Sequence, residues 1–197
     1  MQNSLLYIHG KGGSAAEAEH YRPLFPGHAV VGLDYRSSTP WEAGAEIRKA
    51  VEALRTGGSA VRLIANSIGA LYTLYAGVSS LLERAWFISP FLDMEPLILS
   101  LLDQEHLTEK DLQDRGSVPT ASGLLLRWDI LSFIRTQPIL WDVPTEILYG
   151  SRDSLTSYAT VARFAREHKA GLTVMENCEH WFHTPEQMAF LDAWITR

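Results

Sequence analysis

The stretch AVRLIANSIGALYTLYA, residues 60–76, joins three local patterns in immediate succession. Its first six residues are mostly apolar and partly β-branched, as is typical of a strand buried in a parallel sheet. Its last seven residues are mostly good helix formers with helical spacing. Ser67 stands at the turn between them, and the small residues Ala65 and Gly69 flank it at two positions' distance. Such a strand, turn and helix presents the serine hydroxyl above the edge of the sheet.

The rest of the chain alternates short apolar runs with segments of helical spacing. This alternation predicts an α/β fold: a mostly parallel six-stranded sheet with helices on both faces. Arg62 interrupts the apolar pattern of the third strand, and the sequence gives no reason for it. The predicted strands are residues 5–9, 29–33, 60–65, 85–89, 145–149 and 172–175, and the predicted helices are residues 15–24, 41–54, 68–79, 157–168 and 185–195.

The composition limits the size of the fold and the classes of partner that the protein can bind. The chain has 197 residues, 46% hydrophobic and 20% charged, which fits one globular domain with a single core. A formal net charge of −6 offers no basic field for nucleic acid and no polybasic membrane anchor. Cys178 is the only cysteine, so a disulfide within the chain is excluded. With no leader before the first strand and no apolar run long enough to span a bilayer, we expect a cytoplasmic protein that binds neither nucleic acid nor membranes.

Three further motifs accompany Ser67. The loop HGKGG, residues 9–13, follows the first predicted strand, Asp153 follows the fifth, and His180 follows the sixth. This set, in the order serine, acid, histidine, resembles the α/β-hydrolase superfamily, and within it the small bacterial-type serine hydrolases and carboxylesterases. The resemblance implies a trimmed α/β-hydrolase fold, because the full family sheet has two further strands before the His-Gly loop.

Residues 91–141 interrupt the alternation of strands and helices. Apolar runs there flank a polar stretch, and we expect two or three helices inserted within a single domain, residues 1–197. The resemblance implies a lid at this point, since ligands bind beyond the carboxyl ends of parallel strands. The alternative is an ordinary crossover whose helices pack beneath the sheet.

The resemblance assigns catalytic roles to three side chains. A serine hydroxyl is a weak nucleophile, so it needs an imidazole to take its proton and a third group to orient that imidazole. These roles go to Ser67, His180 and Asp153, respectively. The alternative for the serine is that it only caps the helix that follows it.

Two of these assignments have local rivals. His183 lies close to His180, but residues 184–187 read as a capped helix start, which leaves His180 in the free loop. Asp93 rivals Asp153, because some family members carry the acid after the preceding strand. Both carboxylates also suit turns and caps.

The resemblance also assigns an oxyanion hole. A tetrahedral intermediate needs two preorganised N–H donors, and these map onto the backbone amides of Lys11 and Ile68. The alternative for a glycine-rich loop is phosphate binding, but neither G-x-G-x-x-G nor the Walker pattern is present. His9 is most simply a loop-orienting residue, and we expect no cofactor and no metal. Trp128 and Trp181 are candidate substrate contacts, with packing alone as the alternative.

Together these features predict a serine hydrolase that cleaves carboxylic esters of small or medium acyl groups and binds a small-molecule ester substrate. Two alternatives stay open: a non-catalytic binding protein of the same fold, and a hydrolase of that fold acting on amides, thioesters or carbon–carbon bonds. Because a histidine base must be neutral, we expect activity to fall below about pH 6.5. The sequence leaves the natural substrate and the oligomeric state open.

Overall fold

The computed structural model describes residues 3–55 and 58–197. The chain forms two compact units, which are described separately. The first comprises residues 1–92 and 140–197, and the second comprises residues 93–139. Among the described residues, no helix combines the length and the hydropathy of a membrane span.

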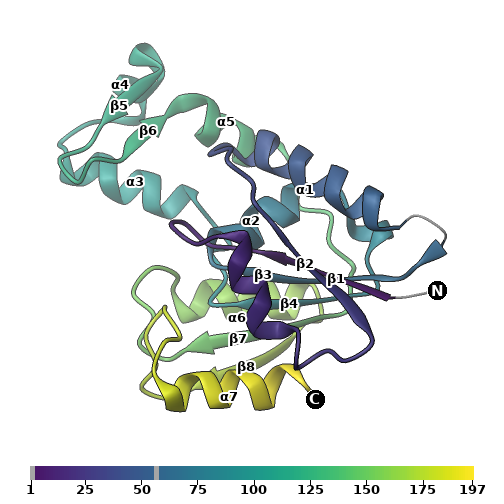
Figure 1. The fold of residues 1–197 in the computed structure, drawn as a ribbon. Helices are drawn as coiled ribbons and strands as arrows, with labels where there is room; N and C mark the ends of the chain where they lie inside the picture. The colour runs from purple at the N-terminus through teal and green to yellow at the C-terminus, as the bar shows by residue number, and fades with distance from the viewer. Residues whose placement is uncertain (1–2, 56–57) are drawn as a thin grey trace. The chain divides into compact units, whose positions relative to one another are not determined.

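The first unit is built on a six-stranded sheet (Figure 1). Its strand order is β2-β1-β3-β4-β7-β8, and every neighbouring pair is parallel. The six-stranded parallel sheet predicted from the alternating pattern is therefore confirmed, with strand ends that differ by one or two residues. The strands are β1 (Asn3–Ile8), β2 (His28–Leu33), β3 (Val61–Asn66), β4 (Arg84–Ile88), β7 (Thr145–Gly150) and β8 (Gly171–Met175).

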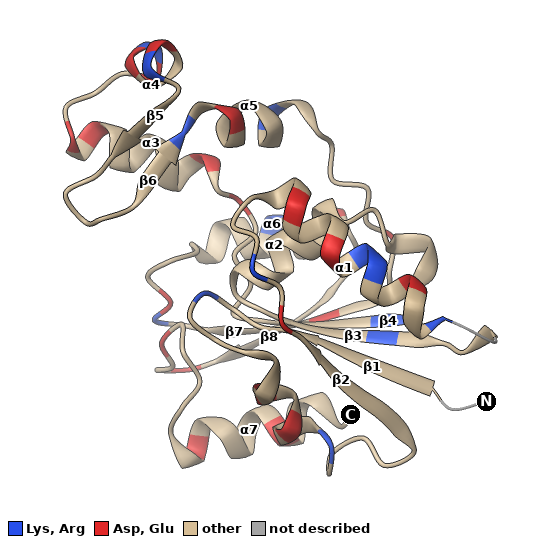
Figure 2. Ribbon diagram, turned by 45° about the horizontal axis from the view of Figure 1, so that its top comes forward, with Lys and Arg blue, Asp and Glu red and all other residues tan. Residues whose placement is uncertain are grey.

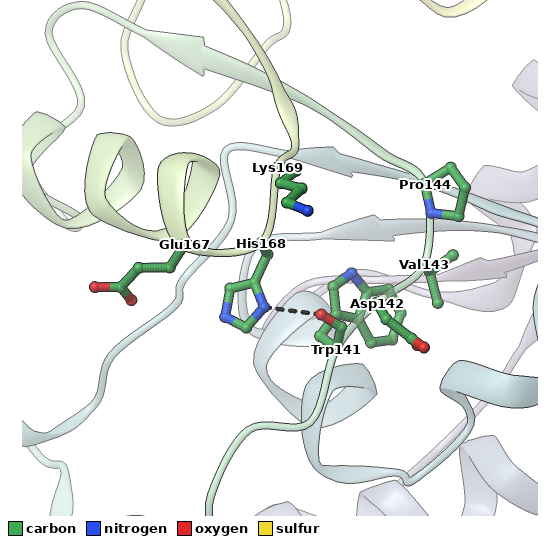
Figure 3. Close-up of a pocket in the computed structure, with 7 residues that line it drawn as sticks. All are labelled: Trp141, Asp142, Val143, Pro144, Glu167, His168 and Lys169. Carbon is green, nitrogen blue, oxygen red and sulfur yellow. Dashed lines mark hydrogen bonds between the residues drawn. The ribbon is translucent and has the colours of Figure 1, made fainter.

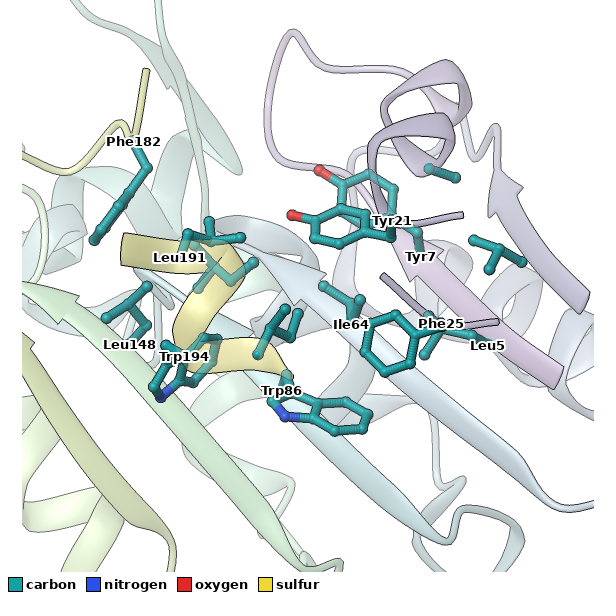
Figure 4. Close-up of a cluster of buried hydrophobic side chains, with 14 of the residues drawn as sticks. Leu5, Tyr7, Tyr21, Phe25, Ile64, Trp86, Leu148, Phe182, Leu191 and Trp194 are labelled. Atoms are coloured by element: carbon teal, nitrogen blue, oxygen red, sulfur yellow. The ribbon is translucent and has the colours of Figure 1, made fainter. Parts of the chain in front are cut away.

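Helices cover both faces of this sheet (Figures 1 and 2). On one face lie α1 (Pro40–Leu54), α2 (Ile68–Tyr75) and α6 (Tyr158–Glu167), and on the other lie the 3₁₀ helix η1 (Ala15–Tyr21) and α7 (Pro185–Ile195). Alternate strand residues point to opposite faces. Trp86 accordingly joins the core under η1 and α7 (Figure 4), whereas the ring of Phe87 packs against Phe164 of α6.

Two predicted helices differ in type or length from the expectation. Residues 15–21 form a 3₁₀ helix, and the predicted helix 68–79 ends at Tyr75. Gly77 has a positive φ of 64°, a conformation that stops a helix and suits glycine. A short 3₁₀ helix, η3 (Ser79–Leu81), follows before β4.

Charged residues of both signs are interspersed along the elements (Figure 2). Arg62, which breaks the apolar pattern of β3, donates to Glu83 with Nε 2.7 Å from Oε2. That pair accounts for an arginine in a strand that is otherwise almost wholly apolar, because a partly buried charge needs a partner.

The second unit contains α3 (Glu95–Gln104), α4 (Glu109–Arg115) and α5 (Trp128–Thr136), in keeping with the two or three helices expected there. It also contains a two-stranded antiparallel hairpin, β5 (Ser117–Pro119) and β6 (Leu125–Arg127), which was not predicted. Arg135 of α5 links its own helix to α3 and α4 by donating to Glu95 and Glu109 at 2.8 and 2.6 Å. A lid function for this insertion stays a prediction.

Candidate active site

Ser67 occupies a sharp turn between β3 and α2. Its φ of 51° and ψ of −122° lie outside the regions that a non-glycine residue ordinarily adopts. Neighbouring backbone groups hold the turn: the Ser67 amide donates to the Ile88 carbonyl at 3.0 Å, and the Ser67 carbonyl accepts from the Phe91 amide at 3.0 Å. The residue as a whole is partly exposed.

Close backbone approach explains the small residues around this turn. A Cβ on Gly69 would lie 2.7 Å from the His9 carbonyl oxygen, so α2 begins in direct contact with the end of β1. A Cβ on Gly10 would lie 3.1 Å from Cβ of Ser67, which places the glycine-rich loop beside the serine. Ala65, where the usual pattern has glycine, is fully buried in β3.

The three side chains predicted to act together form one hydrogen-bonded chain. Ser67 Oγ lies 2.7 Å from Nε2 of His180, and Nδ1 of His180 lies 2.6 Å from Oδ2 of Asp153. Asp153 Oδ1 also accepts from the amides of Leu155 and Thr156, at 2.8 and 3.1 Å. A carboxylate acceptor at Nδ1 favours the tautomer whose Nε2 is free to accept the serine proton.

Burial differs along this chain of side chains. The carboxylate of Asp153 has no solvent exposure, whereas 17% of the His180 side chain is exposed. The acid is therefore shielded from water, and its interaction with the imidazole is strengthened accordingly.

Two loops are tied together to bring His180 to Asp153. The amide of Ser151 donates to the Met175 carbonyl at 3.0 Å, and the amide of Arg152 donates to the Cys178 carbonyl at 2.9 Å. The Ser151 hydroxyl in turn accepts from the Asn177 amide at 2.8 Å. These contacts were missed by the sequence reading, because the residues that make them carry no recognisable chemistry of their own.

The rival side chains make other contacts. The His183 amide donates to Gln187 Oε1 at 3.0 Å, and its ring Nδ1 lies 2.7 Å from the Trp181 carbonyl oxygen. It therefore belongs to the start of α7, where Thr184 caps the helix as predicted. Asp93 accepts from the Glu95 amide at 3.2 Å, in a turn immediately before α3.

The candidate oxyanion donors stand at the two backbone turns beside Ser67. Ile68 is the first residue of α2, where helix amides have no carbonyl partner within the helix. Lys11 lies in the loop that Gly12, with a φ of 78°, allows to turn, and in the described part of the chain its amide donates to no other backbone group. Their role as oxyanion donors stays a prediction.

The side chain of His9 braces this loop. Its Nδ1 lies 2.7 Å from the Gly10 carbonyl oxygen, and its ring stacks on Tyr35 with centroids 4.3 Å apart. The Tyr35 hydroxyl donates to the His9 carbonyl at 2.8 Å. These contacts fit the loop-orienting role expected of His9.

The two tryptophans proposed as substrate contacts lie in different units. Trp181 directly follows His180, is 69% exposed, and stacks on His183 with centroids 4.8 Å apart. Trp128 opens α5 in the second unit and is half-buried. Contact with substrate stays a prediction for both.

Cys178 is buried beside His180 and does not join the hydrogen-bonded chain. Burial, with the nearby charges of Glu179 and Asp153, raises the pKa of its thiol to about 11. A thiol that keeps its proton at neutral pH is a poor nucleophile.

A hollow of about 440 Å³ lies at the opposite edge of the sheet (Figure 3). It is bounded by the segment that leads into β7 and by the end of α6, so it lies at the amino ends of the strands, away from Ser67. In its wall, the His168 ring Nδ1 lies 2.8 Å from the Trp141 carbonyl oxygen. Its lining residues are Trp141, Asp142, Val143, Pro144, Glu167, His168 and Lys169.

Comparison with known proteins identifies the fold. No protein-family profile and no curated protein matches the sequence. Among solved structures, Est1E from Butyrivibrio proteoclasticus superposes with a TM-score of 0.80 at 15% identity, over 98% of this chain and 85% of Est1E. Alpha/beta hydrolase domain-containing protein 10 from mouse gives 0.70 at 16% identity, over 99% and 88% of the two chains. The proline iminopeptidase-related protein from Thermus thermophilus gives 0.63 at 22% identity, over 99% and 90%.

Proposed function

From the premise that this chain has the α/β-hydrolase fold, we propose that it is a serine hydrolase that cleaves carboxylic esters of small or medium acyl groups through an acyl-enzyme on Ser67. One observation carries the proposal: the unbroken hydrogen-bonded chain from Ser67 through His180 to Asp153, on a strained turn at the carboxyl ends of the strands. A serine that only capped α2 would not need an imidazole at 2.7 Å. The turn gives no cap either, because the Ser67 side chain makes no capping hydrogen bond.

The geometry supports a two-step reaction. His180 Nε2 takes the Ser67 proton as Oγ attacks the acyl carbonyl, and Asp153 stabilises the imidazolium that forms. The amides of Lys11 and Ile68 donate to the oxyanion of the tetrahedral intermediate. His180 then gives its proton to the departing alkoxide, the alcohol leaves, and the acyl group stays on Ser67.

Water completes the cycle. His180 takes a proton from a water molecule, which attacks the acyl-enzyme through a second oxyanion intermediate. Collapse of that intermediate returns the proton to Ser67 and releases the carboxylic acid. The bond changes in these steps are acyl and proton transfers, which need neither a redox step nor a cofactor.

Names among the similar structures support an ester substrate. One solved structure is described as ferulic acid bound to Est1E, another as esterase PE8, and a third as a thioesterase domain from the curacin biosynthetic pathway. Acyl transfer from oxygen or sulfur to serine uses the same proton transfers. For this chain we propose oxygen esters as the substrates.

The test is hydrolysis of p-nitrophenyl acetate, butyrate and octanoate by the wild-type protein, by Ser67→Ala and by a matched control, Ser80→Ala. Ser80 is an exposed serine in η3, so its variant should keep wild-type activity. We expect Ser67→Ala to lose at least about 10³-fold in kcat, because the nucleophile is gone.

A fluorophosphonate probe separates an enzyme from a binding protein of the same fold. We expect the probe to label the wild-type protein on Ser67 and to leave Ser67→Ala unlabelled, since only an activated serine reacts. A folded wild-type protein that neither hydrolyses the esters nor takes up the probe would overturn the proposal.

A further inference from the structure

Glu17 of η1 joins two parts of the chain that flank the candidate oxyanion site. Its Oε2 accepts from the Tyr7 hydroxyl at 2.5 Å, and its Oε1 accepts from the Ser14 amide at 3.0 Å. Tyr7 lies near the end of β1, and Ser14 closes the glycine-rich loop that begins at His9. One carboxylate therefore holds both ends of that loop.

Tyr7 extends this connection to the serine turn. The side chain of Asn66, the residue that immediately precedes Ser67, interacts with the Tyr7 hydroxyl and lowers its pKa, opposite to the effect of burial. Tyr7 and Glu17 therefore lie between the turn that carries Ile68 and the loop that carries Lys11.

Gly13 fits the carboxylate closely. A Cβ at this position would lie 2.5 Å from Oε1 of Glu17 and 3.1 Å from Cβ of His9. The loop therefore packs directly on Glu17, and glycine is the residue that permits the approach. This is a packing reason for the third glycine of the loop, separate from the turn at Gly12.

Tyr7 is suited to be a permanent donor. Its side chain is almost fully buried, with its ring next to Tyr21 (Figure 4). Burial, then the neighbouring Tyr21 and Glu17, raise the pKa of the Tyr7 hydroxyl far above its ordinary value, so it keeps its proton. A hydroxyl that donates to a carboxylate makes a stronger hydrogen bond than two neutral partners do.

The loop needs such a restraint. Gly10, Gly12 and Gly13 give it far more conformational freedom than other residues would. An oxyanion hole works because its donors are already in place when charge develops on the substrate. A loop that sampled several conformations would have to be ordered again in every catalytic cycle, and the Lys11 amide would then stabilise the oxyanion less.

We propose that Tyr7 and Glu17 are positioning residues that hold the Lys11 amide in register with the Ile68 amide. The inference rests on the proposed function, since it assigns these side chains to the oxyanion site of that reaction. They act through the backbone, and neither touches substrate.

The experiment compares Tyr7→Phe, Glu17→Gln and the double variant with two matched controls. Tyr21→Phe removes a neighbouring buried hydroxyl from the same core, and Glu19→Gln removes a surface carboxylate from the same short helix. Glu17 itself is exposed, so its variant should fold.

We expect each single variant to lower kcat by about tenfold, a fraction of the 10²–10³ that deletion of an oxyanion donor costs, with KM within about twofold of wild type. Inhibition by a trifluoromethyl ketone, which forms a tetrahedral adduct, should weaken by the same factor. The double variant should be no worse than Glu17→Gln alone, because Tyr7 acts on the loop only through Glu17. The pH at which kcat/KM is half-maximal should not move, since His180 and Asp153 are untouched.

Amide hydrogen exchange provides a readout that does not need turnover. We expect residues 10–14 to exchange at least about tenfold faster in Tyr7→Phe and Glu17→Gln, while β1 keeps its wild-type protection. An active wild-type protein with unchanged kcat and exchange in both variants would overturn the positioning role alone. Equal losses in the control variants, or losses that follow the melting temperature across the whole set, would also overturn it. An inactive wild-type protein would overturn the proposed function, and the exchange measurement would still decide whether the restraint exists.

Discussion

Gly150 lies directly against the backbone of Glu179: a Cβ added to the glycine would stand 2.5 Å from the Glu179 carbonyl oxygen. Gly150 ends β7, and Glu179 precedes His180. The loop that carries the imidazole therefore crosses the end of β7 at a point where no side chain fits. Together with the backbone hydrogen bonds of Ser151 and Arg152, this contact holds His180 beside Asp153.

Replacing this glycine should separate the imidazole from its partners. We expect Gly150→Ala to lower kcat for p-nitrophenyl butyrate by at least about tenfold, because a displacement on the order of 1 Å in an active site costs up to about 10²-fold. Fluorophosphonate labelling should slow by a similar factor. A melting curve recorded in parallel shows whether the variant is folded, and a folded variant with wild-type labelling would contradict this reading.

The choice of carboxylate can be tested with isosteric amides. Asp153→Asn keeps the size of the side chain but removes the charge that stabilises an imidazolium, so we expect kcat to fall by about 10³–10⁴-fold. Asp93→Asn retains an oxygen that accepts from the Glu95 amide and should stay within about twofold of wild type. Steady-state kinetics on both variants decides between them, and the reverse pattern would move the acid to Asp93.

Cys178 should be inert in the folded protein. Because burial raises the pKa of its thiol to about 11, we expect no reaction with iodoacetamide at pH 8 under native conditions and complete reaction in urea, as read by intact mass. Rapid native labelling would show that the thiol is neither buried nor protonated.

The same shift predicts a loss of stability at alkaline pH. The folded thiol keeps its proton between its ordinary pKa of 9.0 and about 11, whereas the unfolded thiol loses it, so the free energy of unfolding falls as pH rises through this window. Urea titrations from pH 8 to 11 should show a shallower fall for Cys178→Ala than for wild type. Burial of Tyr21 raises the pKa of its hydroxyl as well, so part of the fall should remain.

Trp181 should affect substrate binding more than folding. Its side chain is 69% exposed, so Trp181→Ala removes little buried surface and should leave the melting temperature within about 2 °C of wild type. If the indole contacts substrate as proposed, KM for 1-naphthyl acetate should rise several-fold while kcat changes little. An unchanged KM for both aromatic and aliphatic esters would remove Trp181 from the substrate site.

The sheet could be predicted because each strand is a short apolar run followed by a helical pattern. Local chemistry was enough for β3 and α2, and the Thr184 cap correctly marked the start of α7. The hairpin β5–β6 was missed because its strands have three residues each, one includes proline, and both lie in or beside polar sequence. The type of η1 was missed as well, since apolar spacing does not distinguish a 3₁₀ helix from an α-helix over seven residues.

The site was only partly readable from the sequence, for a different reason. Asp153 and Asp93 both follow strands, and only the crossing of the two loops shows which carboxylate meets His180. Gly150 and Ser151 carried no signal, because their contribution is backbone geometry that depends on residues 24 or more positions away.

The long separation of Ser67 and His180 along the chain has a consequence for biosynthesis. A ribosome has already produced Ser67 and its turn more than a hundred residues before the imidazole is translated. Until β8 and the loop after it have been translated and have packed beside β7, Ser67 has no imidazole partner, so in the proposed mechanism it stays an ordinary, unreactive alcohol. The proposed activity would therefore depend on completed folding of this loop, and a polypeptide truncated before His180 would lack it.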